Sequence, residues 1–200
     1  LELILREEYP EKALRRADSL GILKEAYPFL RGDGWLEEKF ERARALWHTS
    51  PHSVYMPLLI YHFSEQECQH FIERFRIPAA TARIMRDTLH LKAKLHILAN
   101  PHLVPSAVYN LLQSYSPTAI SAVAVASDDA TVRRHLHLYL KKLRYVKTSL
   151  NGDSLMLMGL PAGKRLGEIL NALKEARLDG RVKTKKEEED LIHLWLSKEG

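Results

Sequence analysis

The spacing of apolar residues constrains the fold of this chain more than any other feature. Leu166, Ile169, Leu170 and Leu173 lie at positions i, i+3, i+4 and i+7, and the segment 35–47 repeats the same helical spacing. Residues spaced in this way share one face of an amphipathic helix. No alternating run of β-branched residues is long enough to predict a strand. The sequence therefore predicts an all-α fold, a multi-helix body and tail with no substantial sheet.

Turn and capping residues divide the chain into successive expected helices. Ser64 and Glu67 have capping-box spacing, and Pro10, Pro78 and Pro117 suit first helical turns. The run 54–63 is nearly all apolar and predicts a short buried helix. The other expected helices cover about 10–20, 35–47, 64–75, 78–98, 106–115, 117–127, 131–145, 164–178 and 185–198.

Composition places the chain among ordinary globular proteins. It has 200 residues, enough for one large or two small domains, with 46% hydrophobic and 28% charged residues. No apolar run approaches the roughly 20 residues of a membrane helix. The single cysteine, Cys68, cannot form an internal disulfide, so we expect a cytoplasmic location. The chain opens on Leu1 within a helical pattern and shows no signal peptide, and we expect a piece of a longer protein.

Positive charge is concentrated in the C-terminal part of the chain. The formal net charge is +5, and residues 128–186 contain 14 Lys and Arg against 6 Asp and Glu, a local net of 14 − 6 = +8. Such an excess favours an acidic partner such as nucleic acid. The alternative is a solvated basic surface without a nucleic-acid ligand.

The chain shows no pattern typical of catalysis or of a metal site. His135 and His137 point to different sides of a helix, and no cysteine or acidic cluster completes a tetrahedral ligand set. Nothing near Cys68 marks it as a nucleophile. No Walker glycine loop, nucleophile elbow or H-E-x-x-H motif is present, and there is no D-x-D pair to hold Mg²⁺. We expect packing or surface histidines, and neither catalytic residues nor a metal.

Two stretches could face phosphates. In the expected helix 131–145, four basic side chains have offsets 0, 3, 7 and 10 and form one stripe, with two further lysines nearby. The stripe consists of Arg134, His137, Lys141 and Arg144, and the nearby lysines are Lys142 and Lys147. The alternative is an ordinary solvated helix face.

The second stretch is the turn Gly159–Gly163, which precedes the expected helix 164–178. Pro161 fixes its own φ, and the two glycines can adopt positive φ. The free N–H groups of the following helix then lie beside Lys164 and Arg165. Amides, the positive end of a helix dipole and two cations together form a plausible phosphate seat. The alternative is a purely structural hairpin.

The C-terminal fifth of the chain, LNGDSLMLMGLPAGKRLGEILNALKEARLDGRVKTKKEE, resembles the C-terminal signature of bacterial tRNA nucleotidyltransferases and the related poly(A) polymerases. One departure is Pro161-Ala162-Gly163, where the family has Pro-Gly-Pro. A weaker likeness covers residues 8–30, which resemble the segment after the neck of those enzymes. The matching positions are Gly152, Asp153, Leu155, Gly159, Pro161, Gly163, Gly167, Ile169, Leu170, Leu178, Asp179, Gly180 and Thr184.

The resemblance implies an RNA-binding part of such an enzyme without its catalytic head. The family's head carries a Gly-Ser loop and a D-x-D pair, and this chain has neither. Mg²⁺ and ATP or CTP are expected only for that head, with no cofactor in this chain, and the choice of added nucleotide is expected to lie in head and neck. The expected partners are tRNA or another folded RNA and the head of the same polypeptide, with no membrane.

The implied organisation has three segments. Residues 1–34 are the end of a neck-like RNA-binding segment, 35–127 a helical body, and 128–200 a basic helical tail with the Gly/Pro hairpin. The other interpretations are a helical protein–protein interaction domain and an all-helical metal-dependent hydrolase. The candidate RNA-binding residues are Gly163, Lys164, Arg165, Arg134, Lys141, Lys142, Arg144, Lys147, Arg181, Lys183, Lys185 and Lys186.

Overall fold

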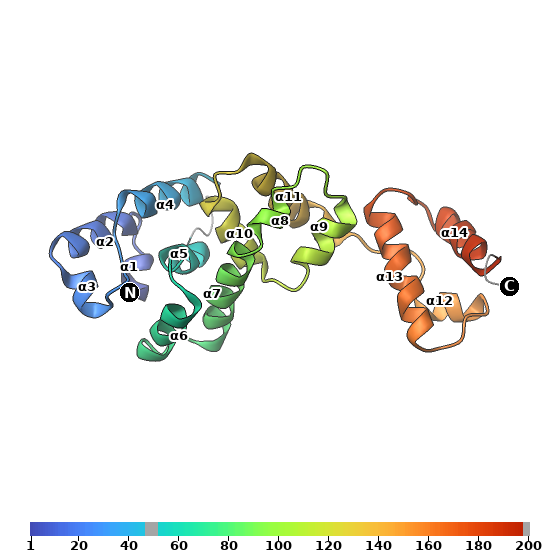
Figure 1. The fold of residues 1–200 in the computed structure, drawn as a ribbon, viewed down its shortest axis with the longest axis horizontal. Helices are drawn as coiled ribbons and strands as arrows, with labels where there is room; N and C mark the ends of the chain where they lie inside the picture. Colours follow the sequence, from blue (N-terminus) through green and yellow to red (C-terminus); the bar gives the residue numbers. More distant parts are fainter. Residues whose placement is uncertain (47–51, 198–200) are drawn as a thin grey trace. The chain divides into compact units, whose positions relative to one another are not determined.

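The computed structural model describes residues 1–46 and 52–197, and these residues are helical throughout their regular parts (Figure 1). They form fourteen α-helices, one 3-10 helix and no strand. The prediction of an all-α fold is therefore confirmed. Among the described residues, no helix is both long and apolar enough to cross a membrane.

The chain contacts divide the protein into two compact units, which do not follow the order of the sequence. Unit 1 consists of Leu1–Pro101 and Ser114–His137, and unit 2 of His102–Gln113 and Leu138–Gly200. The three segments expected from the sequence do not coincide with these units, because residues 102–113 pack with the C-terminal part of the chain. The roles expected for those segments remain predictions.

Unit 1 is organised around α10 (Pro117–Ala126), which packs against α4, α5 and α7. Every residue from Ala122 to Ala126 is buried, and the small alanine side chains among them let neighbouring helices approach closely. The buried run predicted at 54–63 forms much of the facing surface, as α5 and the residues after it. The remaining helices of this unit are α1 (Glu2–Leu5), α2 (Pro10–Ser19), α3 (Ile22–Ala26), α4 (Gly34–Leu46), α5 (His52–Leu59), α6 (Glu65–Arg74), α7 (Ala79–Lys92), α8 (Leu95–Leu98) and most of α11 (Ala130–Lys141).

Charged side chains inside unit 1 are paired. Lys39 is only 1% exposed, and its ammonium donates to Asp128 at 2.7 Å and to Glu38 at 2.9 Å. Burial lowers the pKa of Lys39, but the hydrogen bonds to the two carboxylates outweigh this effect and leave the pKa above its ordinary value. Glu11 of α2 is likewise buried and accepts two hydrogen bonds from Arg44 of α4. The Lys39–Asp128 and Arg44–Glu11 pairs join segments that are distant in sequence.

Unit 2 is built from α9 (Pro105–Leu112), η1 (Leu143–Tyr145), α12 (Gly152–Leu157), α13 (Lys164–Leu178) and α14 (Lys185–Ser197). The apolar face predicted for helix 164–178 packs against a core that includes Leu155, Leu160 and Ile192. Asp179 fixes α9, because its carboxylate accepts from the backbone N–H and the hydroxyl of Ser106. α13 therefore connects α9 with α12 and α14.

A fully buried carboxylate holds the C-terminal helices together. Glu188 of α14 accepts hydrogen bonds from the backbone N–H groups of Ser149 and Leu150 at 2.8 and 3.0 Å. Its other oxygen accepts from Arg177 of α13 at 2.9 Å. A single side chain thereby satisfies two backbone donors and one cation.

Several helix boundaries differ from the sequence-based expectation. The capping box at Ser64 and Glu67 is present, with both reciprocal hydrogen bonds. The expected helix 78–98 is interrupted at residues 93–94, and α12 was not predicted at all. The expected ends at 47 and 198 lie outside the described residues.

We predict that Glu188→Ala lowers the free energy of unfolding of unit 2 by about 3 kcal/mol, because two buried N–H groups and a guanidinium lose their acceptor. Hydrogen exchange of the Ser149 and Leu150 amides, with a urea unfolding curve, measures the effect. The matched control is Glu189→Ala, since the Glu189 carboxylate lies 3.6 Å from Lys185 in an i,i+4 ion pair on the surface of α14. Equal stability of the two variants would contradict this role.

We predict opposite effects for two glycines of the same segment. Gly163 has a φ of +146°, so Gly163→Val should lower the free energy of unfolding by about 1–3 kcal/mol. Gly167 lies inside α13 with nothing within 4 Å of an added Cβ, and Gly167→Ala should raise it by up to about 1 kcal/mol. Circular dichroism during urea unfolding distinguishes the two variants, and a stable Gly163→Val protein would refute the backbone argument.

Candidate nucleic-acid interface

The turn between α12 and α13 has the backbone that its glycines suggested. Gly159 and Gly163 both have positive φ, at +95° and +146°. Leu160 between them is buried, and its N–H donates to the Leu155 carbonyl at 3.1 Å. Gly163 is the N-cap of α13 and supplies no side-chain acceptor to the first turn of that helix. The turn thus fixes where α13 begins and leaves its first N–H groups without a side-chain cap.

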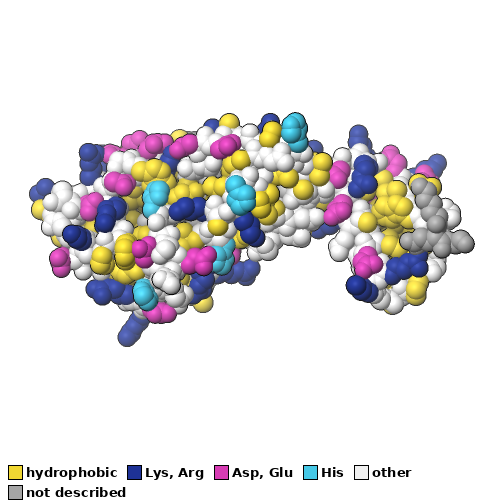
Figure 2. Space-filling view, in the orientation of Figure 1, with side chains coloured by type: hydrophobic (Ala, Val, Ile, Leu, Met, Phe, Trp, Pro, Cys, Tyr) yellow, Lys and Arg dark blue, Asp and Glu magenta, His cyan; other side chains and the backbone are white. Residues whose placement is uncertain are grey.

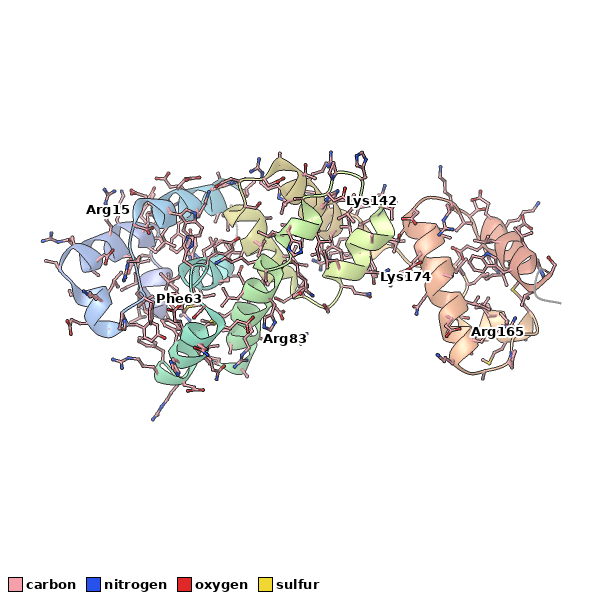
Figure 3. The ribbon with its side chains drawn as sticks, viewed as in Figure 1. Arg15, Phe63, Arg83, Lys142, Arg165 and Lys174 are labelled. Carbon is pink, nitrogen blue, oxygen red and sulfur yellow. The ribbon has the colours of Figure 1, made fainter. Side chains whose placement is uncertain are left out.

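Two exposed cations follow at once in α13. The Lys164 side chain is 94% exposed, and its ammonium lies 3.6 Å from Glu168 in an i,i+4 pair. Arg165 is also exposed, at the start of the same helix (Figure 3). An exposed pair at this distance adds little to stability, so Lys164 is available to an anionic ligand at small cost. The structure therefore brings the uncapped helix terminus and the two cations together, as the sequence suggested.

The predicted basic stripe on helix 131–145 is not continuous. α11 ends at Lys141, Lys142 has φ −131° and ψ −62°, and a 3-10 turn follows. Arg134 and Lys141 keep their helical spacing, whereas Arg144 leaves it and lies 4.8 Å from the Tyr145 ring centre. The prediction that Arg144 shares a helix face with Arg134 was therefore wrong, because α11 ends at Lys141, before Arg144.

The cations of this region also divide between the two units. Arg134 belongs to unit 1, and Lys141, Lys142, Arg144 and Lys147 belong to unit 2. Arg134 is therefore considered with unit 1, and the other four cations are considered with unit 2. All five are exposed, so each remains a candidate for contact with an anionic ligand.

The last candidate cations flank the start of α14. Arg181 lies 3.8 Å from Asp179, and Lys185 lies 3.6 Å from Glu189. The backbone N–H of Lys183 donates to the Glu187 carboxylate, which holds the turn before α14 and leaves the Lys183 side chain exposed. Lys186 is exposed in the first turn of the helix. Arg181 and Lys185 therefore each lie near a carboxylate of this chain, whereas Lys183 and Lys186 are exposed.

One basic stretch was missed by the sequence analysis. Residues 74–94 contain six Lys and Arg and one acid, a local net of 6 − 1 = +5 within 21 residues. The stretch 128–186 has a larger net charge at a lower density, so the total alone does not reveal the denser stretch 74–94. The structure places it on α7 and at the end of α6, on the surface of unit 1.

The structure places both His135 and Cys68 in the interior of the protein. His135 is a packing residue, since it is buried with Nδ1 2.9 Å from the Leu98 carbonyl. Cys68 is buried, and burial raises the pKa of its thiol to about 11. No group of three or more His, Cys, Asp or Glu side chains that could hold a metal occurs in the described part of the chain.

A comparison with known proteins finds one informative relative. The chain is 35% identical over 83 residues to the A-adding tRNA nucleotidyltransferase of Geobacter sulfurreducens, and the match covers 42% of this chain and 9% of that protein. No family model matches the chain. The sequence likeness is thus substantial but confined to a small part of a much longer relative.

Solved structures extend the likeness to nearly the whole chain. The Thermotoga maritima CCA-adding enzyme complexed with tRNA matches with a TM-score of 0.69 and 18% identity, over 97% of this chain and 50% of that chain. A CCA-adding enzyme solved with CTP matches with a TM-score of 0.70 and 20% identity, over 98% and 49%. The chain therefore resembles a tRNA nucleotidyltransferase in sequence over 83 residues, and its helical fold corresponds to about half the length of each matched CCA-adding enzyme chain.

Proposed function

We propose that this chain binds and positions tRNA, or another folded RNA, for a nucleotidyltransferase whose catalytic head is carried elsewhere on the same polypeptide. The observation that supports this most is the fold match over 97% of the chain to a CCA-adding enzyme solved with tRNA. The basic surface described above is consistent with that role, because RNA backbones attract clustered cations.

The proposed mechanism at the α12–α13 turn is recognition of phosphate rather than of base sequence. The uncapped N–H groups of α13 can donate to phosphate oxygens, and the helix dipole favours negative charge there. Lys164 and Arg165 add two positive charges at the same place. Contacts of this kind fix the register of an RNA without reading its bases.

We expect the double variant Lys164→Glu/Arg165→Glu to bind tRNA more weakly and to melt as the wild type does, because both side chains are exposed. Loss of two phosphate contacts flattens the plot of log affinity against log salt by up to about 2. Filter binding across a salt series measures this effect. The matched neutral variant is Lys164→Gln/Arg165→Gln. Its affinity for tRNA should lie between those of the wild type and the charge-reversed variant.

An unchanged affinity and salt slope in the charge-reversed protein would remove the turn from the interface. A wild type that shows no salt-dependent binding of tRNA would instead favour a protein-interaction domain. The two results separate an error in the site from an error in the function.

We also predict that the chain alone adds no nucleotide to RNA, because it contains neither a Gly-Ser dipeptide nor a D-x-D pair. Incubation with tRNA lacking its 3′ end, Mg²⁺ and labelled ATP or CTP tests this prediction. A catalytic tRNA nucleotidyltransferase under the same conditions is the positive control. Label incorporated by highly purified chain would overturn the proposed division of labour.

A further inference from the structure

We propose that the end of α6 and the exposed side of α7 form a second RNA-backbone surface, made of Arg74, Arg76, Arg83 and Arg86. This inference rests on the proposed function, since it takes RNA as the ligand, but it concerns unit 1 rather than the α12–α13 turn. All four side chains are exposed. Dark-blue side chains gather over this part of unit 1 in Figure 2, and Figure 3 shows Arg83 on α7. We call these four residues the α6–α7 arginine cluster.

The cluster differs from those cations of unit 1 that form ion pairs between its segments. Lys39, Arg42 and Arg44 each have a carboxylate oxygen within 4.0 Å. Within the described residues, no carboxylate lies within that distance of any member of the cluster. Arg86 instead donates two hydrogen bonds, at 3.0 and 3.3 Å, to the neutral amide oxygen of Gln69. The four positive charges are therefore left uncompensated at the surface.

Acidic residues are present on the same helices, but they are engaged with other groups. Glu73 accepts from Gln69 at 2.6 Å, and Glu67 closes the capping box with Ser64. Asp87 accepts from the backbone N–H of Ser116 at 2.8 Å, next to the start of α10. Each of these carboxylates has a structural role that does not neutralise an arginine.

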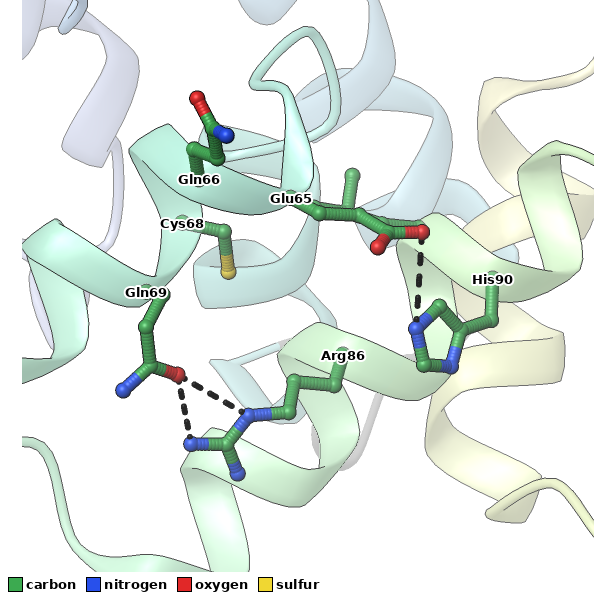
Figure 4. Close-up of a pocket in the computed structure, with 7 residues that line it drawn as sticks. Glu65, Gln66, Cys68, Gln69, Arg86 and His90 are labelled. Atoms are coloured by element: carbon green, nitrogen blue, oxygen red, sulfur yellow. Dashed lines mark hydrogen bonds and ion pairs between the residues drawn. The ribbon is translucent and has the colours of Figure 1, made fainter.

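A hollow beside the cluster gives a bound group room to enter. It has a volume of about 270 Å³ between α6 and α7, with Arg86, Gln69 and His90 on its rim and Cys68 and Leu89 among its lining (Figure 4). Glu65 also lines the hollow, and its carboxylate lies 3.6 Å from the ring of His90 (Figure 4). The Arg86–Gln69 bonds hold the guanidinium at the edge of the hollow, where it can meet a ligand that rests there.

The guanidinium groups of the cluster favour phosphate as a ligand over a simple counterion. A guanidinium donates along a planar edge and binds phosphate oxygens bidentately, which a lysine ammonium cannot do. Arg83 and Arg86 are three residues apart on one helix and so lie on the same face. Two guanidinium groups on one face can contact two different phosphates of an RNA backbone, which a single small anion does not offer.

The test compares three proteins for tRNA binding across a salt series: wild type, Arg83→Glu/Arg86→Glu, and Arg83→Lys/Arg86→Lys. We expect the acidic variant to lose about tenfold in affinity and to show a salt slope flattened by up to about 2. The lysine variant keeps the charge, so it should keep the slope and lose affinity only modestly. Melting curves establish that each variant is folded, and Arg83→Gln/Arg86→Gln serves if the acidic variant is not.

Arginine-specific chemical modification, read by mass spectrometry, provides residue-level evidence. Bound tRNA should protect Arg83 and Arg86 of the wild type from the reagent. Combining Arg83→Glu/Arg86→Glu with Lys164→Glu/Arg165→Glu should give additive losses, because the two surfaces meet different phosphates.

Three results would overturn the inference. The acidic variant could bind tRNA as the wild type does while Lys164→Glu/Arg165→Glu weakens binding, in which case only the turn contacts RNA. Affinity could fall without protection of the arginines, which would indicate a bulk charge effect. Inorganic phosphate or AMP could protect the arginines where tRNA does not, which would make the site one for a small anion. Failure of the wild type to bind tRNA would instead refute the proposed function itself.

Discussion

The buried carboxylate of Glu188 is the interaction on which the geometry of unit 2 depends. It accepts from two backbone amides directly before α12 and from Arg177 near the end of α13, while it stands on α14 itself. α12 begins with Asn151 as its N-cap, one residue after Leu150. The position of α12, and hence of the turn that starts α13, is thereby tied to one side chain. The RNA contact proposed at that turn therefore depends on a carboxylate that is fully buried.

Two groups of cations in this protein differ in the partners that they contact. Lys39, Arg44 and Arg177 each form an ion pair in which one of the two side chains is buried. These ion pairs stabilise the packing between segments of the fold. Lys164 and the α6–α7 arginine cluster are exposed and have weak, neutral or no partners among the described residues. A net charge cannot separate these groups, because both count equally in it. Only the contacts show which cations have charge to offer a ligand.

The sequence predicted the fold and the turn well, for reasons that lie in local chemistry. The spacing of Leu166 and Leu173 is a property of one helix, and the positive φ of Gly163 follows from a residue without a Cβ. The break at Lys142 was not predicted, because no proline or glycine marks it. Glu188 stands in a run of four acids and looks like a surface residue, since its partners are distant in sequence. The arginine cluster was not predicted, because its charge is confined to a short stretch and only the folded structure shows which of its arginines have no carboxylate partner among the described residues.

The positions that carry the resemblance to tRNA nucleotidyltransferases turn out to have structural roles in this chain. Asp179 holds the start of α9, Gly180 has a φ of +74°, and the Thr184 hydroxyl accepts from Glu187 in the first turn of α14. Lys164 and Arg165, by contrast, are not among the matched positions. The shared pattern therefore specifies helix ends and turns. Lys164 and Arg165, which are proposed to contact RNA, lie next to these positions in the sequence. A scaffold fixed in this way can hold the proposed phosphate contacts of Lys164 and Arg165 in place, although neither cation belongs to the shared pattern.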